Sequence, residues 1–250
     1  MLSVSLFRGF RIRKIVSDHD KSIKYIMKTI KIILKNLALA LFFFLALFLS
    51  AGRITYRQGW LYVAMYLIMT AMTLLSMRGN TELMNERVNP GKGIKKWDKI
   101  LLGISAPVYL IMLVVAGLDS GRFSWSPDLH WSLYILAVML TLSGHSFFLI
   151  AKRQNKFFST VVRIQTERGH TVCDTGLYKI IRHPGYSGMM ISTLGFPLLT
   201  GSLWSFIPVL TSVLILLIRT HLEDATLINE LEGYREYTLK TRYRLIPGVW

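Results

Sequence analysis

Uncharged segments alternate with strongly charged ones along the whole chain. Five segments contain no Asp, Glu, Lys or Arg: 36–52, 58–77, 100–118, 129–151 and 184–218. The first four contain 17, 20, 19 and 23 residues, close to the roughly 20 that a helix needs to cross a bilayer. The pattern therefore predicts one membrane-spanning helix in each of these four segments.

The fifth uncharged segment, 184–218, is too long for a single crossing. As one helix it would measure about 52 Å at 1.5 Å per residue, against a hydrocarbon core of about 30 Å. Gly201 and Ser202 lie at its centre and favour a tight turn between two spans, at 185–200 and 203–221. The pattern as a whole predicts an all-α fold, a multi-pass membrane bundle of about six transmembrane helices.

The positive charges support this topology independently. Of the 30 Lys and Arg residues, 27 fall on one side of the predicted membrane and three on the other. The positive-inside rule then places both termini and the large polar loops in the cytoplasm, at the plasma membrane of a prokaryote or the endoplasmic reticulum of a eukaryote. The net charge of +16, with 52% hydrophobic residues and a mean hydropathy of +0.41, is explained by membrane topology and anionic lipid. No nucleic-acid partner is needed.

Three regions follow from this reading. Residues 1–35 form a basic cytoplasmic segment, 36–151 hold four spans with a basic loop at 78–99, and 152–250 carry most of the remaining polar residues. The first apolar block has no convincing cleavage site after it, which argues against a cleaved signal peptide. Met27 is an alternative start of the protein.

Cysteine and histidine usage narrows the chemistry further. Cys173 is the only cysteine, so we expect no intramolecular disulfide and no cysteine-rich metal site. The sequence also has no HExxH motif or acidic cluster, and we predict no metal. His145 is a lone ionisable residue inside a predicted span. It is either functional or a neutral histidine bonded to a neighbouring helix.

The segment 152–183 is long for a connection between membrane helices, and long ordered loops are commonly functional. It contains a β-leaning run at 157–165, a turn at 168–169 and a second extended run at 170–173, and it leads into GLYKIIRHPGYSG at 176–188. Extended backbone of this kind offers N–H and C=O groups that a polar ligand can satisfy near a membrane.

A second polar segment follows the last predicted span. Arg219 and Glu223 are four residues apart and therefore share a helix face. A simple interpretation is a helix-end pair, in which the arginine reaches lipid phosphate and the glutamate forms a weak surface salt bridge. Tyr234 and Tyr237, taken singly, are typical of aromatic residues at a membrane interface.

Taken together, the order and spacing of these motifs resemble the isoprenylcysteine carboxyl methyltransferase family. The resemblance covers about 85 residues, 165–250, whereas the N-terminal half is similar only as a series of spans. The residues that carry it are Gln165–Thr166–Glu167, HTVC at 170–173, GLYKIIRHPGYSG at 176–188, RTHLEDATL at 219–227, Tyr234, Tyr237, Arg244 and Pro247.

The resemblance implies a multi-pass membrane enzyme that uses S-adenosylmethionine to methylate the carboxylate of a lipophilic or prenylated acceptor within the bilayer. Region 152–250 would be its catalytic region, made of a cofactor loop, a helical hairpin and a C-terminal helix. Arg219 would face the acceptor. Two departures from the family pattern are Asp224 in place of glutamate and a shorter turn between Glu167 and His170. The implied cofactor contacts are Gln165, His170, Thr171, Val172, Cys173, Tyr178, His183, Pro184, Gly185, Tyr186 and Glu223.

The chemistry of these residues is compatible with such a reaction. Glu223 can pair with an ammonium group, and the rings of Tyr178 and Tyr186 can face a sulfonium or an adenine. A carboxylate acceptor is already ionised at neutral pH, since its pKa is about 3.5, so no general base is required. Arg219 is a bidentate donor that stays protonated and can orient that carboxylate.

Other functions fit parts of the same pattern. A phospholipid amine methyltransferase would need a base, for which His183, His170 or His221 could serve. A membrane sterol or steroid reductase would use NADPH, and Arg182 and Arg242 could bind its 2′-phosphate. A third possibility is a non-catalytic membrane scaffold that keeps the cofactor pocket.

Overall fold

The computed structural model describes residue 27, residues 29–77, residue 86 and residues 91–250. The chain divides into two units, residues 1–39 and 40–250, and each is considered by itself. Most of the predicted N-terminal segment and the first part of the basic loop lie outside the described residues. In the first unit, the described residues from Thr29 onward are helical.

Long apolar helices dominate the described chain, in agreement with the predicted all-α membrane bundle. Within the described residues, five helices are long and apolar enough to cross a membrane. They are Thr29–Ala51, α2 (Arg57–Ser76), Lys96–Phe123, α5 (Trp131–Gln154) and α8 (Phe206–Glu230). The third of these contains α4 (Lys96–Ala116) and a π-helical turn (Gly117–Phe123). Each of the four spans predicted before residue 152 overlaps one of these helices.

The span predicted at 185–200 differs from the expectation of one continuous helix. It is divided into α6 (Pro184–Leu194) and α7 (Phe196–Thr200), and neither piece alone is long enough to span. The break falls at Gly195, beside Pro197, whose nitrogen cannot donate a helical hydrogen bond. Gly201 follows with φ +69°, a left-handed conformation, and so the predicted turn between the two arms of the hairpin is confirmed.

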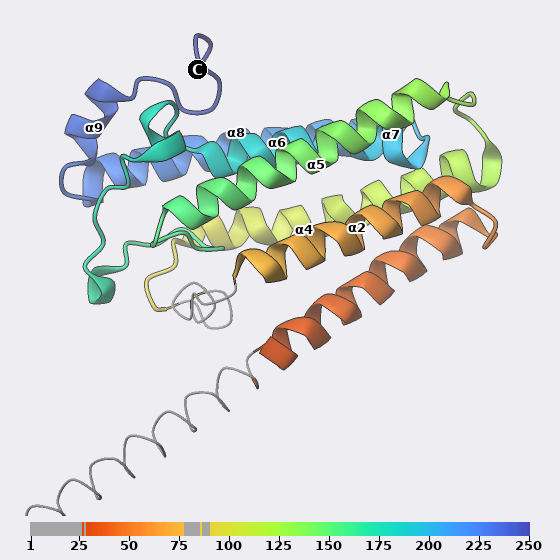
Figure 1. Cartoon of the computed structure of the whole chain (residues 1–250), viewed down its shortest axis with the longest axis horizontal. Helices are drawn as coiled ribbons and strands as arrows, with labels where there is room; N and C mark the ends of the chain where they lie inside the picture. Colours follow the sequence, from red (N-terminus) through yellow and green to blue (C-terminus); the bar gives the residue numbers. More distant parts are fainter. Residues whose placement is uncertain (1–26, 28, 78–85, 87–90) are drawn as a thin grey trace, which may run out of the picture. The chain divides into compact units, whose positions relative to one another are not determined.

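Helix pairs make up the described part of the second unit. α6 packs against both α5 and α8, α4 packs against α8, and α2 packs against α5 and α7 (Figure 1). Glycines let α5 and α6 approach closely: a Cβ on Gly144 would lie 2.4 Å from the nitrogen of Ser192, and one on Gly188 would lie 2.6 Å from the oxygen of Gly144. Small residues at a helix crossing permit such backbone contact. The end of α5 is thereby held beside the start of α6.

The C-terminal segment folds back over the start of α6. The short helix α9 (Tyr234–Lys240) packs against the end of α8. An isolated parallel bridge joins Ile181 to Tyr243. Beside it, the nitrogen of His183 donates to the oxygen of Arg244 at 2.9 Å. The residues before α6 are thus fixed by a part of the chain sixty residues away.

Candidate functional site

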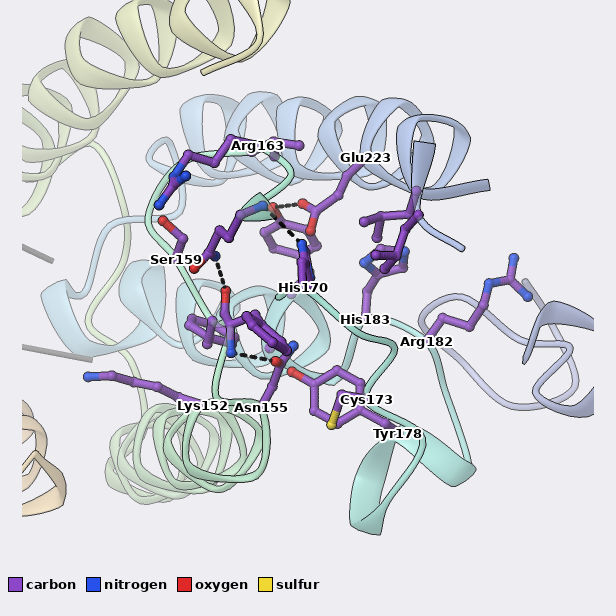
Figure 2. A pocket seen from close by; sticks show the side chains of 18 of the residues that line it. Lys152, Asn155, Ser159, Arg163, His170, Cys173, Tyr178, Arg182, His183 and Glu223 are labelled. Carbon is purple, nitrogen blue, oxygen red and sulfur yellow. Dashed lines mark hydrogen bonds between the residues drawn. The ribbon is translucent and has the colours of Figure 1, made fainter. Parts of the chain in front are cut away.

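A cavity of about 370 Å³ lies where α5 ends, α6 begins and the last turns of α8 pass. The loop between α5 and α6 (Figure 2), together with Leu102 of α4 and the rings of Tyr234 and Tyr237, completes its lining. Every predicted site residue except Pro184 lines it; Pro184 instead begins α6 and is buried there. The lining residues that the sequence singled out are Gln165, His170, Thr171, Val172, Cys173, Tyr178, His183, Gly185, Tyr186, Arg219 and Glu223. The roles assigned to them stay predictions.

Gln165 organises the loop from the inside. Its side chain is 1% exposed, and its Nε2 donates to the oxygen of Phe157 at 2.6 Å. A short 3₁₀ turn over Thr166–Arg168 follows and ends at Gly169, whose φ of +60° confirms the predicted turn. The predicted extended runs form no β-strand among the described residues. The amide of Gln165 therefore shapes the cavity wall by holding the loop together.

His170 is a neutral imidazole in this loop. The backbone N–H of Gln165 donates to its Nδ1 at 3.3 Å, which assigns the proton to Nε2. Burial, with the nearby cations Arg163 and Arg168, lowers the pKa of His170 to about 4. Its ring packs against Phe157, with 4.4 Å between the ring centroids. At neutral pH His170 therefore presents an N–H donor and an apolar ring, and no charge.

The extended backbone after His170 provides further donors. Among the described residues, the backbone N–H groups of Thr171, Val172 and Cys173 donate to no other group. Unpaired N–H groups need water or a ligand. The Cys173 thiol beside them has its pKa raised by burial, so it stays protonated and unreactive.

Glu223 and Tyr186 lie in direct contact at the cavity wall. The hydroxyl of Tyr186 donates to a carboxylate oxygen of Glu223. The ring of Tyr186 stacks on that of His183, with 5.9 Å between the centroids and 20° between the planes. Glu223 is an intermediate case in exposure and is the one carboxylate of α8 that lines the cavity. This side of the cavity therefore carries a negative charge bordered by aromatic rings.

Arg219 lines the cavity one helical turn before Glu223, and its charge is paired. Its Nε lies 2.7 Å from Oδ1 of Asp98, and its Nη2 donates to the oxygen of Thr160 at 2.9 Å. Arg219 is 8% exposed and Asp98 is fully buried. The interpretation of Arg219 and Glu223 as a surface helix-end pair is therefore wrong, because the arginine is bonded within the protein.

Asp98 is a site residue that sequence reasoning missed. It lies on the first turn of α4 and also accepts a hydrogen bond from the backbone N–H of Val162, at 2.7 Å from Oδ2. A carboxylate directly before a predicted span, in a basic segment, was the only available signal. That signal does not name the partner, which is 121 residues away.

Asp224 is the centre of a buried network behind the cavity. Arg182 binds it through two nitrogens, at 2.8 and 2.9 Å, and Arg244 through Nε at 2.8 Å. Nε2 of His183 and the hydroxyl of Tyr234 complete the network, at 3.2 and 3.0 Å. In Figure 2 the guanidinium of Arg182 points away from His170 and Glu223. Arg182 and His183 thus belong both to the lining of the cavity and to this network.

Tyr234 and Tyr237 are buried parts of the same region. Each is 4% exposed, and the hydroxyl of Tyr237 donates to the oxygen of Tyr178 at 2.6 Å. The interpretation of these tyrosines as interface aromatics is wrong, because α9 folds onto the site and removes both rings from lipid and water.

Arg163 forms a second ion cluster at the rim of the cavity, with one buried and one exposed carboxylate. Its guanidinium lies 2.8 Å from Glu86 and 2.7 Å from Glu167, and Glu86 also accepts a hydrogen bond from Ser159 at 2.8 Å. These bonds raise the pKa of Arg163, so it stays charged. Glu86 belongs to the basic loop of the N-terminal half, which sequence reasoning treated as a connector.

One region of the chain matches a known protein family. Residues 134–229 match the model of the isoprenylcysteine carboxyl methyltransferase (ICMT) family. The matched region runs from α5 through α6 and α7 to the end of α8, and it contains the predicted site residues. The match supports a membrane methyltransferase of the ICMT type. A comparison with curated proteins gives no significant match.

The ICMT match leaves several contributors to the site outside its limits. Asp98 and Glu86 precede the matched residues, whereas Tyr234 and Arg244 follow them. The cavity therefore combines an ICMT-type region with residues from the flanking chain.

Proposed function

We propose that this protein is an integral membrane methyltransferase that uses S-adenosylmethionine to methylate the carboxylate of a lipophilic acceptor. One observation carries the proposal: residues of the motifs at 165–188 and of the motif at 219–227, about thirty residues later, line one cavity. Its volume of about 370 Å³ lies in the range of roughly 300 to 1,000 Å³ that is typical of small-molecule sites. The ICMT match of residues 134–229 supports the same reaction class.

The residues present fit the proposed cofactor. Glu223 offers a carboxylate for the ammonium group, and the free N–H groups at 171–173 offer donors for its polar parts. Tyr186 and Tyr178 supply ring faces, which attract a sulfonium. When bound, S-adenosylmethionine supplies a methyl group on a sulfonium, and transfer to an acceptor oxygen leaves the electron pair of the broken C–S bond on sulfur.

The residues of this chain then have to bind, orient and exclude water. Arg219, held at the cavity wall, donates to the acceptor carboxylate and fixes its position. No proton has to leave a carboxylate that is already ionised, so the site needs no general base. The neutral state of His170 suits this chemistry, because it adds a donor without adding a charge.

The histidines give little support to an amine acceptor. Nδ1 of His170 already accepts a backbone N–H, and His221 is exposed and does not line the cavity. Nε2 of His183 faces Asp224, which is shared with two arginines and a tyrosine.

The arginines expected to bind NADPH give little support to a reductase. Arg182 is bonded to Asp224, and Arg242 is exposed and outside the cavity lining.

The first test is calorimetric titration of the detergent-purified protein with S-adenosylhomocysteine and, separately, with NADPH. We expect micromolar affinity for S-adenosylhomocysteine and none for NADPH. Binding of NADPH alone would move the protein to the reductase class and withdraw the roles of Arg219 and Glu223.

The second test asks which atom is methylated without assuming the acceptor. Membranes that contain the protein are incubated with methyl-labelled S-adenosylmethionine, and the lipid extract is treated with base. A carboxyl methyl ester releases labelled methanol, whereas an N-methyl group does not. We expect base-released label from the wild type and none from Arg219→Ala, which should still bind S-adenosylhomocysteine. Label that is entirely stable to base would favour the amine methyltransferase.

A further inference from the structure

Asp98 connects three separate parts of the chain at the cavity. It lies on α4 and contacts Nε of Arg219 on α8 at 2.7 Å and Nη2 at 3.3 Å. Its other contact is the backbone N–H of Val162 in the cavity loop, at 2.7 Å. Asp98 is 0% exposed, so these bonds are made away from bulk water. A charge-assisted pair in such surroundings has a defined geometry.

The donors of Arg219 are unequally used as a result. Nε of Arg219 donates to Asp98, and Nη2 donates both to Asp98 and to the oxygen of Thr160. Within the described residues, no hydrogen bond occupies Nη1. The guanidinium also lies over the ring of Tyr186, 5.4 Å from its centroid. Its plane is thus held from two sides, and one edge is left for a ligand.

We propose that Asp98 is the positioning residue of the acceptor site, and that it compensates the charge of Arg219 as well as fixing its orientation. This inference rests on the proposed function, since it assigns the Arg219 end of the cavity to a lipophilic carboxylate. Asp98 does not touch the acceptor; it acts through Arg219.

Charge compensation matters because the acceptor changes its charge during the reaction. A carboxylate enters as an anion and leaves as a neutral methyl ester. Without Asp98, Arg219 would bind the anion strongly and would be left as an unpaired buried cation when the ester forms, which is costly. With Asp98 in place, the arginine remains paired before and after transfer. The carboxylate is held by directed hydrogen bonds more than by net charge, so its preference over the ester is smaller than it would be at an unpaired arginine.

The experiment compares binding of a carboxylate with binding of its ester. The full chain is reconstituted in nanodiscs and saturated with S-adenosylhomocysteine. N-acetyl-S-farnesylcysteine and its methyl ester are then titrated, with empty nanodiscs correcting for partition into lipid. For Asp98→Asn we expect the ratio of carboxylate to ester affinity to rise on the order of tenfold, because the cation is no longer compensated.

A matched control removes a buried carboxylate from the same helical segment. Asp119 lies at the far end of Lys96–Phe123, is also fully buried, and accepts hydrogen bonds from Ser126 and Ser202. Asp119→Asn should lower stability and leave the affinity ratio unchanged. If Asp98 were only structural, Asp98→Asn would also leave the affinity ratio unchanged, or it would weaken carboxylate and ester binding by the same factor.

Two further variants keep the proposal open to refutation if Asp98→Asn folds poorly. Arg219→Gln should abolish the preference for the carboxylate and leave ester affinity unchanged. Asp98→Asn combined with Arg219→Gln should lose the rise in the ratio that is expected for Asp98→Asn alone, because Asp98 acts through the arginine. An unchanged ratio in Asp98→Asn, or in Arg219→Gln, would overturn the inference. Absence of S-adenosylhomocysteine binding in the wild type would instead contradict the proposed function. The ratio of carboxylate to ester affinity can still be measured in the absence of S-adenosylhomocysteine, so the two failures are distinguishable.

Discussion

The third membrane helix carries a fully buried aspartate near each end, and the two are used in opposite ways. At one end, Asp98 faces the cation Arg219 beside a cavity. At the other, Asp119 faces neutral donors: the hydroxyls of Ser126 and Ser202, both at 2.6 Å, and the backbone N–H of Trp204 at 3.3 Å. Neither aspartate has any exposed surface.

The two ends differ in whether the bonds of the buried aspartate leave a nearby donor free. Neutral donors satisfy the Asp119 carboxylate completely and tie a loop and the turn before α8 together, so that end is closed. A guanidinium has five donors, and in the part of the chain that the structure describes no hydrogen bond uses Nη1 of Arg219, which lines the cavity. We therefore expect the buried carboxylate to stabilise the fold at one end and to prepare a charged group for a ligand at the other.

The largest effect should come from removing the cavity carboxylate of α8. Glu223→Ala should weaken S-adenosylhomocysteine binding by about 100-fold or more, since a buried or half-buried charge pair is lost. Calorimetry of the purified protein measures this. Glu230→Ala is the control, because Glu230 lies on the same helix but pairs with Lys95 at the surface. Full affinity in Glu223→Ala would sink the assignment of the cavity as the cofactor site.

A smaller effect is expected at the closed end. Asp119→Asn should lower the free energy of unfolding by about 1–3 kcal/mol, because its amide points two donors at groups that also donate. Thermal unfolding in nanodiscs measures the loss, with the exposed Asp128→Asn as control. Binding of S-adenosylhomocysteine should not change. A loss of affinity comparable to that of Glu223→Ala would show that the two ends are not independent.

The pH dependence of stability tests the neutral state of His170. Its pKa is about 4 in the folded protein and about 6.5 in an unfolded chain. The unfolded state therefore binds more protons between these values, so the stability from the neutral imidazole is complete above pH 6.5 and is lost as pH falls toward 4. The thermal midpoint of the wild type should fall more steeply over this range than that of His170→Gln. The exposed His221→Gln should keep the steep slope, and a shallow wild-type slope would contradict the assigned neutral state.

The smallest effect is expected for His145, inside α5. Its Nε2 lies 3.1 Å from the hydroxyl of Thr73 and 3.0 Å from the oxygen of Met69, so it links α5 to α2. It does not line the cavity. His145→Ala should leave S-adenosylhomocysteine affinity within about twofold of the wild type, as expected for independent sites. A large loss in calorimetry would mean that α5 transmits changes at this depth to the cavity.

Several features of this protein could be predicted from local sequence patterns. Segments without charges identify helices that a bilayer can accommodate, because the cost of burying an ionised side chain depends on each segment alone. The turn at Gly201 and the turn at Gly169 follow from residues that tolerate positive φ. The candidate site residues in 165–186 and 219–223 were identified from their order and spacing, and all of them except Pro184 line one cavity.

The sequence by itself thus determined the membrane class, most helix positions and several of the residues that line the cavity. Only the tertiary structure decided their partners: Asp98 for Arg219, and Arg182, Arg244 and Tyr234 for Asp224. It also divided the fifth span into α6 and α7 and buried Tyr234 and Tyr237 under α9. The physical reason is that hydropathy and backbone propensity act over neighbouring residues, whereas the pairing of buried charges depends on which groups are brought together in space. The residues around Asp98 therefore do not identify Arg219 as its partner, because only packing buries the two side chains next to each other.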